Sequence, residues 1–131
     1  MSRRVYLDSS AIVKLVVSES ESDALTGFLR GAAVGASCAL ARVEVLRAVA
    51  VQGPDAADRA RRVLANLELI RLDDVLLDAA GMLGIAGLRS LDAIHVTAAR
   101  QLGHDLECLV TYDRRMGAAA EALGLAVARP A

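Results

Sequence analysis

Short runs of β-prone residues alternate with helix-forming segments along the chain, and this alternation limits the fold more than any other feature of the sequence. The runs span residues 5–7, 34–38, 69–72, 107–111 and 125–127. A helix between two strands carries the chain back across the sheet, so strands joined in this way run parallel. The sequence therefore predicts an α/β fold, an α/β/α sandwich whose central, mainly parallel sheet of four to five short strands is flanked by helices.

Capping residues and glycines indicate where the intervening helices begin and end. Ser18 and Glu21 have the spacing of a capping box for the second helix, which Gly31 ends. The expected helices cover residues 11–17, 18–31, 40–51, 55–67, 73–83 and 91–102, with a last short helix from about 113 to 124. These helices are long enough to cross back over a sheet of short strands.

Length and hydropathy predict one domain over residues 1–131, because a chain of this size buries most of its apolar surface in a single core. The apolar runs are interrupted within a few residues, far short of the roughly 20 that cross a bilayer, so no membrane contact is expected. The first eight residues hold two arginines and an aspartate and lack the apolar core of a secretory signal. We therefore expect a cytoplasmic protein.

Charge, aromatic content and cysteine spacing exclude several kinds of binding site. A net charge of −1 does not suit a protein that holds nucleic acid by general phosphate neutralisation. Aromatic residues make up only 2% of the chain, which rules out an extended stacking groove for single strands. Cys38 and Cys108 are far apart and lack zinc-ligand spacing, so buried, reduced thiols are expected.

Two aspartates follow predicted strands directly. Asp8 comes after the run at 5–7, and Asp113 comes just after the run at 107–111. In open α/β sheets, binding sites form beyond the carboxyl ends of the strands, so both carboxylates are expected at the functional edge. Asp105 precedes its strand and is expected at the opposite edge.

Two further acids interrupt apolar helix faces. Glu44 has Leu40 and Ala48 four residues away on either side, and Val51 lies a further turn along. Asp92 shares its face with Val96 and Ala99. Burial of an unpaired carboxylate costs several kcal/mol, so each acid needs a metal, an arginine or a capped backbone as its partner. A divalent cation would satisfy all four acids together.

Each acid also has an explanation without chemistry. Asp8 and Asp113 can be simple helix N-caps, Glu44 can pair with Arg47, and Asp92 can cap its own helix if that helix begins late. Two histidines lie near the acids in the sequence and are kept out of the predicted site. His95 is interpreted as a packed, hydrogen-bonded side chain, and His104 as a residue at a helix end.

Four segments around these acids resemble a known family. They are residues 5–15 (VYLDSSAIVKL), 41–48 (ARVEVLRA), 91–99 (LDAIHVTAA) and 109–116 (LVTYDRRM). In the order and spacing of the acids the chain resembles PIN-domain ribonucleases of the VapC toxin type, from Val5 to Pro130. The resemblance implies a single PIN domain with a PIN-like α/β/α sandwich fold.

The resemblance also implies a function: a metal-dependent endoribonuclease that cleaves RNA with a metal-activated water, as the toxin of a VapBC-type toxin–antitoxin module. Mg²⁺ or Mn²⁺ is the expected cofactor, and hard oxygen ligands suit both ions. RNA is the expected substrate, a cognate antitoxin the expected protein partner and a homodimer the expected assembly.

Site roles follow in the same way. Asp8 and Asp92 are the expected direct metal ligands, while Glu44 and Asp113 act through water or complete a second cation site. The auxiliary hydroxyls expected beside them belong to Ser9 and Thr111. The arginines expected to contact RNA phosphates, with solvated salt bridges as the alternative, are Arg42, Arg47, Arg114 and Arg115.

Two other classes of function stay open at this point. One is a catalytically inactive PIN-like module that binds RNA or protein and acts in regulation. The other is a receiver-like domain for phosphoryl transfer with Asp8 as nucleophile, but no DxDxT motif follows Asp8 and the chain has no P-loop.

Overall fold

The computed structural model describes residues 3–31 and 34–131. The strands are β1 (Arg4–Leu7), β2 (Val34–Cys38), β3 (Glu68–Ile70), β4 (Leu106–Val110) and β5 (Val127–Ala128). The α-helices are α1 (Ser9–Val16), α2 (Ser22–Arg30), α3 (Leu40–Val49), α4 (Pro54–Ala65), α5 (Asp74–Gly81), α6 (Ser90–Gln101) and α7 (Arg114–Ala122). Short 3₁₀ turns occupy Ala50–Gln52 and Gly103–Asp105.

The strands of the described chain form a single sheet in the order β3-β2-β1-β4-β5. Every neighbouring pair runs parallel, and Tyr6 in the central strand lies beside Ala36 of β2 and Leu109 of β4. The predicted parallel sheet is confirmed. The order reverses between β1 and β4, which is the place where α/β sheets open a crevice beyond the strand ends.

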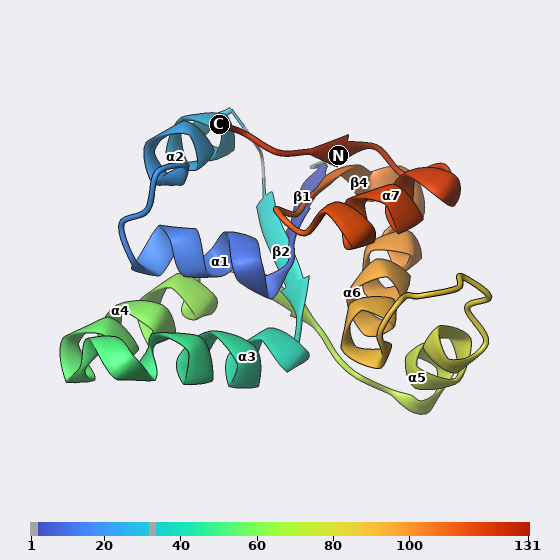
Figure 1. Ribbon diagram of the computed structural model, residues 1–131, viewed down its shortest axis with the longest axis horizontal. Coiled ribbons are helices and arrows are strands. Elements are labelled where there is room, and N and C mark those ends of the chain that lie inside the picture. Colours follow the sequence, from blue (N-terminus) through green and yellow to red (C-terminus); the bar gives the residue numbers. More distant parts are fainter. Residues whose placement is uncertain (1–2, 32–33) are drawn as a thin grey trace.

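Helices cover both faces of this sheet (Figure 1). Residues of α1, α3 and α4 pack on one face, and residues of α5, α6 and α7 pack on the other. β1 contributes to both apolar cores: Val5 and Leu7 pack on the face covered by α1, α3 and α4, while Tyr6 packs on the other face. The predicted α/β/α sandwich is therefore confirmed, and β1 is buried on both sides.

The second helix begins later than the capping-box spacing predicted. α2 starts at Ser22, with Glu21 at its N-cap and no side-chain cap bond. The Glu21 carboxylate instead accepts a hydrogen bond from Lys14 Nζ at 2.7 Å, and the Ser22 hydroxyl accepts one from the backbone N–H of Glu19 at 2.8 Å. The prediction was wrong because the Glu21 carboxylate pairs with Lys14 of the preceding helix, α1, and makes no capping bond to α2.

The buried face of α3 also differs from the prediction. Ala41, Val45 and Val49 are fully buried against α1 and α4, whereas Ala48 is exposed and Val51 is 87% exposed. Small or apolar residues occur on all sides of this segment, so the spacing of apolar residues did not identify the buried side. The stripe that Glu44 was expected to interrupt is therefore the partly solvated side of the helix.

The last strand is displaced from residues 125–127 to Val127–Ala128. Gly124 has φ of +84° and the backbone N–H of Leu125 donates to the carbonyl of Ala120 at 3.0 Å, so Leu125 closes the end of α7. Ala126 then accepts a hydrogen bond from Leu109 at 2.9 Å. Because Leu125 belongs to the cap of α7, β5 begins later in the chain than predicted.

The remaining predictions about the chain concern the cysteines, the membrane and Asp105. Cys38 and Cys108 are both free and buried, as predicted. Asp105 Oδ2 lies 3.9 Å from Nη1 of Arg4, the first residue of β1. Asp105 is therefore at the edge of the sheet opposite the carboxyl ends of the strands, as predicted. No helix in the described part of the chain has the length and apolar character that a bilayer span needs.

Candidate active site

The four predicted acids come from four different elements around the carboxyl ends of β1 and β4. Asp8 is the N-cap of α1, and Asp113 is the N-cap of α7. Glu44 lies in the second turn of α3, and Asp92 lies in the first turn of α6. Burial raises the pKa of the Asp92 carboxyl, and the negative charges of Asp113, Asp8 and Glu44 raise it further. The fold therefore brings the other three acids close enough to Asp92 to raise its pKa.

Asp8 is the most buried of the four, with 2% of its surface exposed. Its Oδ1 accepts hydrogen bonds from the Ser10 hydroxyl at 2.7 Å and from the backbone N–H of Ala11 at 2.9 Å. Its Oδ2 accepts one from the Thr111 hydroxyl at 2.6 Å. Burial raises the pKa of Asp8, and these hydrogen bonds offset part of the rise. Asp8 is thus an N-cap, as the alternative held, and at the same time part of the acidic cluster.

Asp113 and Asp8 are linked through one hydroxyl. The fully buried Thr111 donates to Asp8 and accepts from the backbone N–H of Asp113 at 3.1 Å. Asp113 caps α7 with its Oδ1, which lies 2.9 Å from the backbone N of Arg115 and 3.2 Å from that of Met116. Thr111 therefore fixes the relative position of the two strand-end carboxylates.

Glu44 is held by its Oε1 atom. The Ser9 hydroxyl donates to it at 2.6 Å, and His95 Nε2 lies 2.7 Å from it. Burial raises the pKa of Glu44, but the hydrogen bonds from His95 and Ser9 outweigh burial and lower the pKa below its ordinary value. Within the described residues Glu44 makes no ion pair with Arg47, so that alternative was wrong.

Asp92 differs from the other three acids, because its carboxylate accepts no hydrogen bond from the described chain. The helix begins at Ser90 with Arg89 as N-cap, so the helix does not begin late and Asp92 does not cap it. The helix that the sequence predicted over residues 91–102 thus begins one residue earlier than expected. Asp92 is half-buried, lacks a donor and sits among three other acids. A cation bound beside this carboxylate would offset the charge of its acidic neighbours.

No group of three or more His, Cys, Asp or Glu side chains within residues 3–31 and 34–131 is close enough to form a complete ligand set. The donor chemistry nevertheless fits Mg²⁺ or Mn²⁺, which prefer carboxylate oxygens. Mg²⁺ keeps several waters and is commonly held by one or two carboxylates, so three converging acids are not required. The repulsion at Asp92 is what such a cation would relieve.

Basic side chains border the acids. Arg89, Arg114 and Arg115 line a hollow of about 230 Å³ together with Asp92 and Asp113. Arg114 and Arg115 are exposed and form no ion pair within the described chain. Arg42 and Arg47 are likewise exposed on α3 and lack an ion-pair partner there. Arg89 was not predicted, although its place three residues before Asp92 on a helix start was a usable signal.

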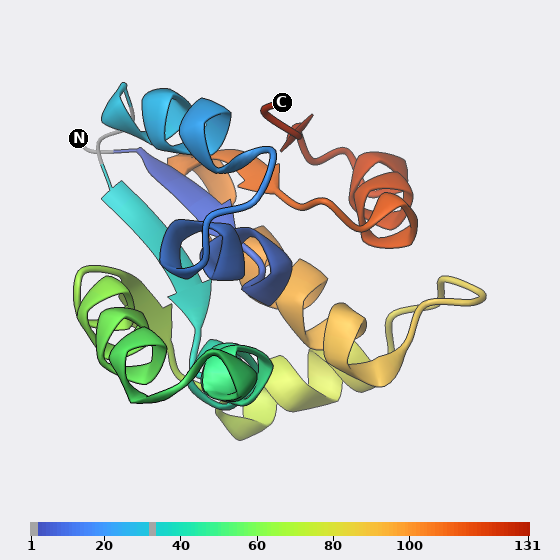
Figure 2. The ribbon, with the colours of Figure 1, turned by 60° about the vertical axis from the view of Figure 1, so that its left-hand side comes forward.

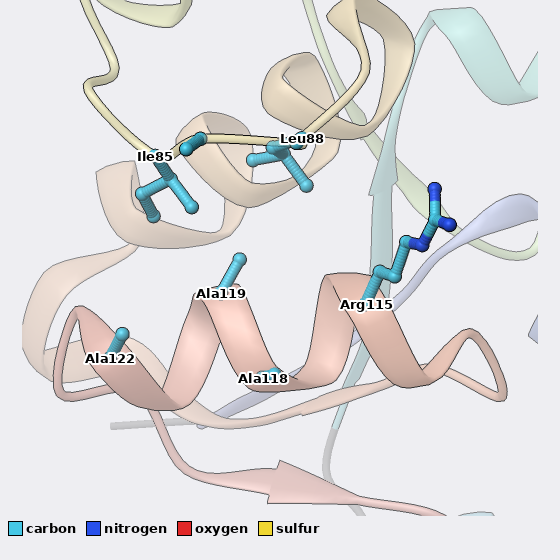
Figure 3. Close-up of a pocket in the computed structure, with 8 residues that line it drawn as sticks. Ile85, Leu88, Arg115, Ala118, Ala119 and Ala122 are labelled. Carbon is cyan, nitrogen blue, oxygen red and sulfur yellow. The ribbon is translucent and has the colours of Figure 1, made fainter.

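A larger apolar groove adjoins this hollow (Figure 3). It has a volume of about 470 Å³ and lies between the loop from Ile85 to Leu88 and one side of α7. That loop joins α5 to α6 and extends beyond both helices (Figure 2). Arg115 lines both the groove and the hollow.

His95 is a packed, hydrogen-bonded residue, as predicted, with 2% of its surface exposed. Its bond to Glu44 nevertheless ties it to the acids, which the sequence did not reveal. Burial lowers the pKa of His95, but hydrogen bonds with Cys38 and Glu44 outweigh burial and raise the pKa to about 10. His104 lies in the 3₁₀ turn after α6, at the helix end where it was predicted.

Comparison with known proteins gives consistent matches along the chain. The PIN domain family matches residues 5–122. The chain is 54% identical to Ribonuclease VapC46 of Mycobacterium tuberculosis over 126 residues, which cover 96% of the chain and 97% of that protein. It is 42% identical to Ribonuclease VapC35 of the same species, with 96% of each chain covered.

Structural comparison agrees with this on the fold. The crystal structure of Mycobacterium tuberculosis VapC20, described as a toxin that cleaves the sarcin-ricin loop, superposes with a TM-score of 0.77. The match covers 96% of the chain and 99% of VapC20, at 16% sequence identity. At that identity the likeness supports the α/β/α fold alone.

Proposed function

The chain belongs to the PIN-domain family and, within it, to the VapC ribonucleases, and from this premise we propose that it is the endoribonuclease toxin of a toxin–antitoxin pair. The substrate is RNA, and the reaction is hydrolysis of a phosphodiester bond. The single observation that supports this most strongly is the gathering of Asp8, Glu44 and Asp113 around Asp92, which has a raised pKa and no hydrogen-bond donor in the described chain.

The proposed activity depends on Mg²⁺ or Mn²⁺. Asp8 and Asp92 would hold the cation directly, while Glu44 and Asp113 would act through water or at a second cation. When bound, the cation lowers the pKa of a water and stabilises the charge that develops on the phosphate. The hard oxygen donors and the mutual repulsion of the acids support this assignment.

The protein itself orients the reactants. Thr111 and Ser10 fix the Asp8 carboxylate, and Ser9 fixes Glu44. Glu44 Oε2 accepts no hydrogen bond within the described chain, and neither does Asp113 Oδ2. Each of these oxygens can accept a hydrogen bond from the attacking water and so direct it toward the phosphate.

RNA would be held by its phosphates at the arginines around the acids. Arg114 and Arg115 border the hollow, and Arg42 and Arg47 lie exposed on the helix that carries Glu44. Local arginines of this kind compensate for a net charge of −1. From family membership we further propose a cognate antitoxin, a homodimer, a single PIN domain over residues 1–131 and a cytoplasmic location.

The test is cleavage of defined RNAs by the purified chain with Mn²⁺, with Mg²⁺ and with excess chelator. We expect cleavage only with added cation, and loss of cleavage in folded Asp8→Asn and Asp92→Asn variants. Asp105→Asn is the matched control, because this carboxylate lies beside Arg4 at the opposite edge of the sheet. Full activity in chelator, or in either folded variant, would rule out the metal mechanism.

The alternative proposal is a catalytically inactive PIN-like module that binds RNA or protein in regulation. It is favoured by one observation, that no three potential ligands in the described chain converge closely enough to form a complete metal site. Binding of RNA without cleavage in Mn²⁺ would support it. The phosphoryl-transfer alternative is disfavoured, because Asp8 is 2% exposed and both of its oxygens accept hydrogen bonds.

A further inference from the structure

A chain of buried polar side chains runs from the sheet to the acidic cluster. The Tyr6 hydroxyl lies 2.8 Å from His95 Nδ1, and His95 Nε2 lies 2.7 Å from Glu44 Oε1. The three residues come from β1, α6 and α3, so the contacts form only in the folded sheet. Tyr6 is fully buried and His95 is 2% exposed. The chain therefore ends in the core on one side and at the proposed active site on the other.

Both ring nitrogens of His95 are engaged, which fixes the direction in which the imidazole donates. Burial raises the pKa of Tyr6 well above its ordinary value, so its hydroxyl stays protonated and can donate to Nδ1. In a neutral ring with Nδ1 as acceptor, the proton is on Nε2 and faces Glu44. In the protonated ring both nitrogens donate, and Nε2–H again faces Glu44. The Tyr6 ring packs edge-on against the imidazole, with centroids 5.9 Å apart.

The two donors to Glu44 reach the same oxygen. Ser9 Oγ and His95 Nε2 both contact Oε1, and within the described chain neither contacts Oε2. A carboxylate held by one oxygen in this way cannot rotate freely about its last bond. Its other oxygen, Oε2, has no partner among residues 3–31 and 34–131 and keeps one orientation.

We propose that His95 is a positioning residue of the active site, which holds Glu44 by Oε1 so that Oε2 serves the reaction, and that Tyr6 holds His95 in place. This inference rests on the proposed function for its catalytic consequence. Its geometric content, that His95 sets the conformation of Glu44, stands separately. Partners that orient active-site ligands are commonly worth about 10–100-fold in activity or metal affinity.

Two substitutions of similar size separate positioning from packing. In His95→Gln the amide nitrogen takes the place of Nε2 and can still donate to Glu44. In His95→Asn the amide takes the place of Nδ1, where it can reach Tyr6 and Cys38 but not Glu44. Each variant loses the contacts of one ring nitrogen, those with Tyr6 and Cys38 in His95→Gln and those with Glu44 and Ser9 in His95→Asn, so a purely structural role predicts similar effects of both. Tyr6→Phe keeps the aromatic ring and removes only the hydroxyl.

The measurements are kcat and KM for RNA cleavage, the Mn²⁺ dissociation constant by calorimetry and the crystal structures of the variants. We expect His95→Asn to lower kcat about 10–100-fold with little change in KM, because the phosphate contacts remain. His95→Gln should keep kcat within about threefold of the wild-type value, and the kcat of Tyr6→Phe should lie between those of His95→Asn and His95→Gln. Mn²⁺ affinity should follow the same order, and Glu44 should leave its native rotamer in His95→Asn only.

Equal loss of kcat in His95→Asn and His95→Gln would overturn the inference, as would an unchanged Glu44 rotamer in His95→Asn. If His95→Asn does not fold, Tyr6→Phe decides, and an unchanged kcat in that variant counts against the inference. If the wild-type chain does not cleave RNA, the proposed function fails. The Glu44 rotamers in the variant structures then decide the role of His95 without any activity.

Discussion

Thr111→Val should destabilise the protein far more than an equally conservative change at Thr97. Both threonines are buried, with exposures of 0% and 5%. The Thr111 hydroxyl donates to Asp8 Oδ2 at 2.6 Å and accepts from the backbone N–H of Asp113 at 3.1 Å. The Thr97 hydroxyl has no hydrogen-bond partner in the described chain. Valine keeps the shape of both side chains and removes only the hydroxyl.

The expected size of the effect follows from the bonds removed. A hydrogen bond to a charged group contributes about 1.5–3 kcal/mol, and a backbone N–H left without a partner costs about a further 1 kcal/mol. We therefore expect Thr111→Val to lower the free energy of unfolding by about 2.5–4 kcal/mol. Thr97→Val should be neutral or slightly stabilising, because it removes a polar group that is buried without a partner.

Urea unfolding of the wild type and the two variants, in chelator, measures both values. The slope of free energy against urea should be the same in all three proteins, so that the midpoints report stability directly. Thr111→Val should also lose RNA cleavage, since the Asp8 carboxylate loses the hydroxyl that holds its Oδ2 atom. A Thr111→Val variant within about 0.5 kcal/mol of wild type, or no less stable than Thr97→Val, would refute the reasoning.

Three further predictions concern other parts of the molecule. Arg115→Gln should weaken RNA binding and reduce the slope of log affinity against log salt by about 1, measured by filter binding at several salt concentrations. An unchanged slope would mean that Arg115 contacts no RNA phosphate. Gly53→Ala should destabilise the protein by about 1–3 kcal/mol, because Gly53 has φ of +94°, whereas Gly27→Ala inside α2 should stabilise it by about 0.5–1 kcal/mol. Thermal unfolding that ranks the two variants in the opposite order would contradict this. Burial raises the pKa of Cys108 from 9.0 to about 11, so the stability that this thiol contributes below pH 9.0 should be lost as the pH rises toward 11. Cys108→Ala should reduce that loss, and an unchanged profile of stability against pH in the variant argues against the shift.

The parallel sheet could be predicted from sequence because its signals are local. Each strand is a short apolar run next to a helix cap or a glycine, and alternation with helices leaves few other topologies. The positions of Asp8 and Asp113 follow from the same logic, since both come after strands. Their capping roles were visible too, because an N-cap is defined by its neighbours in sequence.

Features that depend on distant contacts were not predictable in this way. The capping box at Ser18 was wrong because Lys14, on the preceding helix, takes the Glu21 carboxylate. The bond between Glu44 and His95 joins residues 51 positions apart, and no local pattern indicates it. The pattern along α3 placed Glu44 on the wrong stripe, because small or apolar residues occur on every side of this helix.

The link between Thr111 and Asp8 spans 103 positions of the chain, and it has a consequence for how the protein is made. β1 pairs with β4 as well as with β2, so a growing chain that ends before β4 leaves the central strand half-paired. Such a chain also lacks Thr111 and Asp113, and Asp8 then has no partner across the strand ends. Synthesis therefore delivers the acidic cluster late, after most of the protein has been translated. Under the proposed function, an unfinished chain would therefore not cleave RNA before Thr111 and Asp113 have been added.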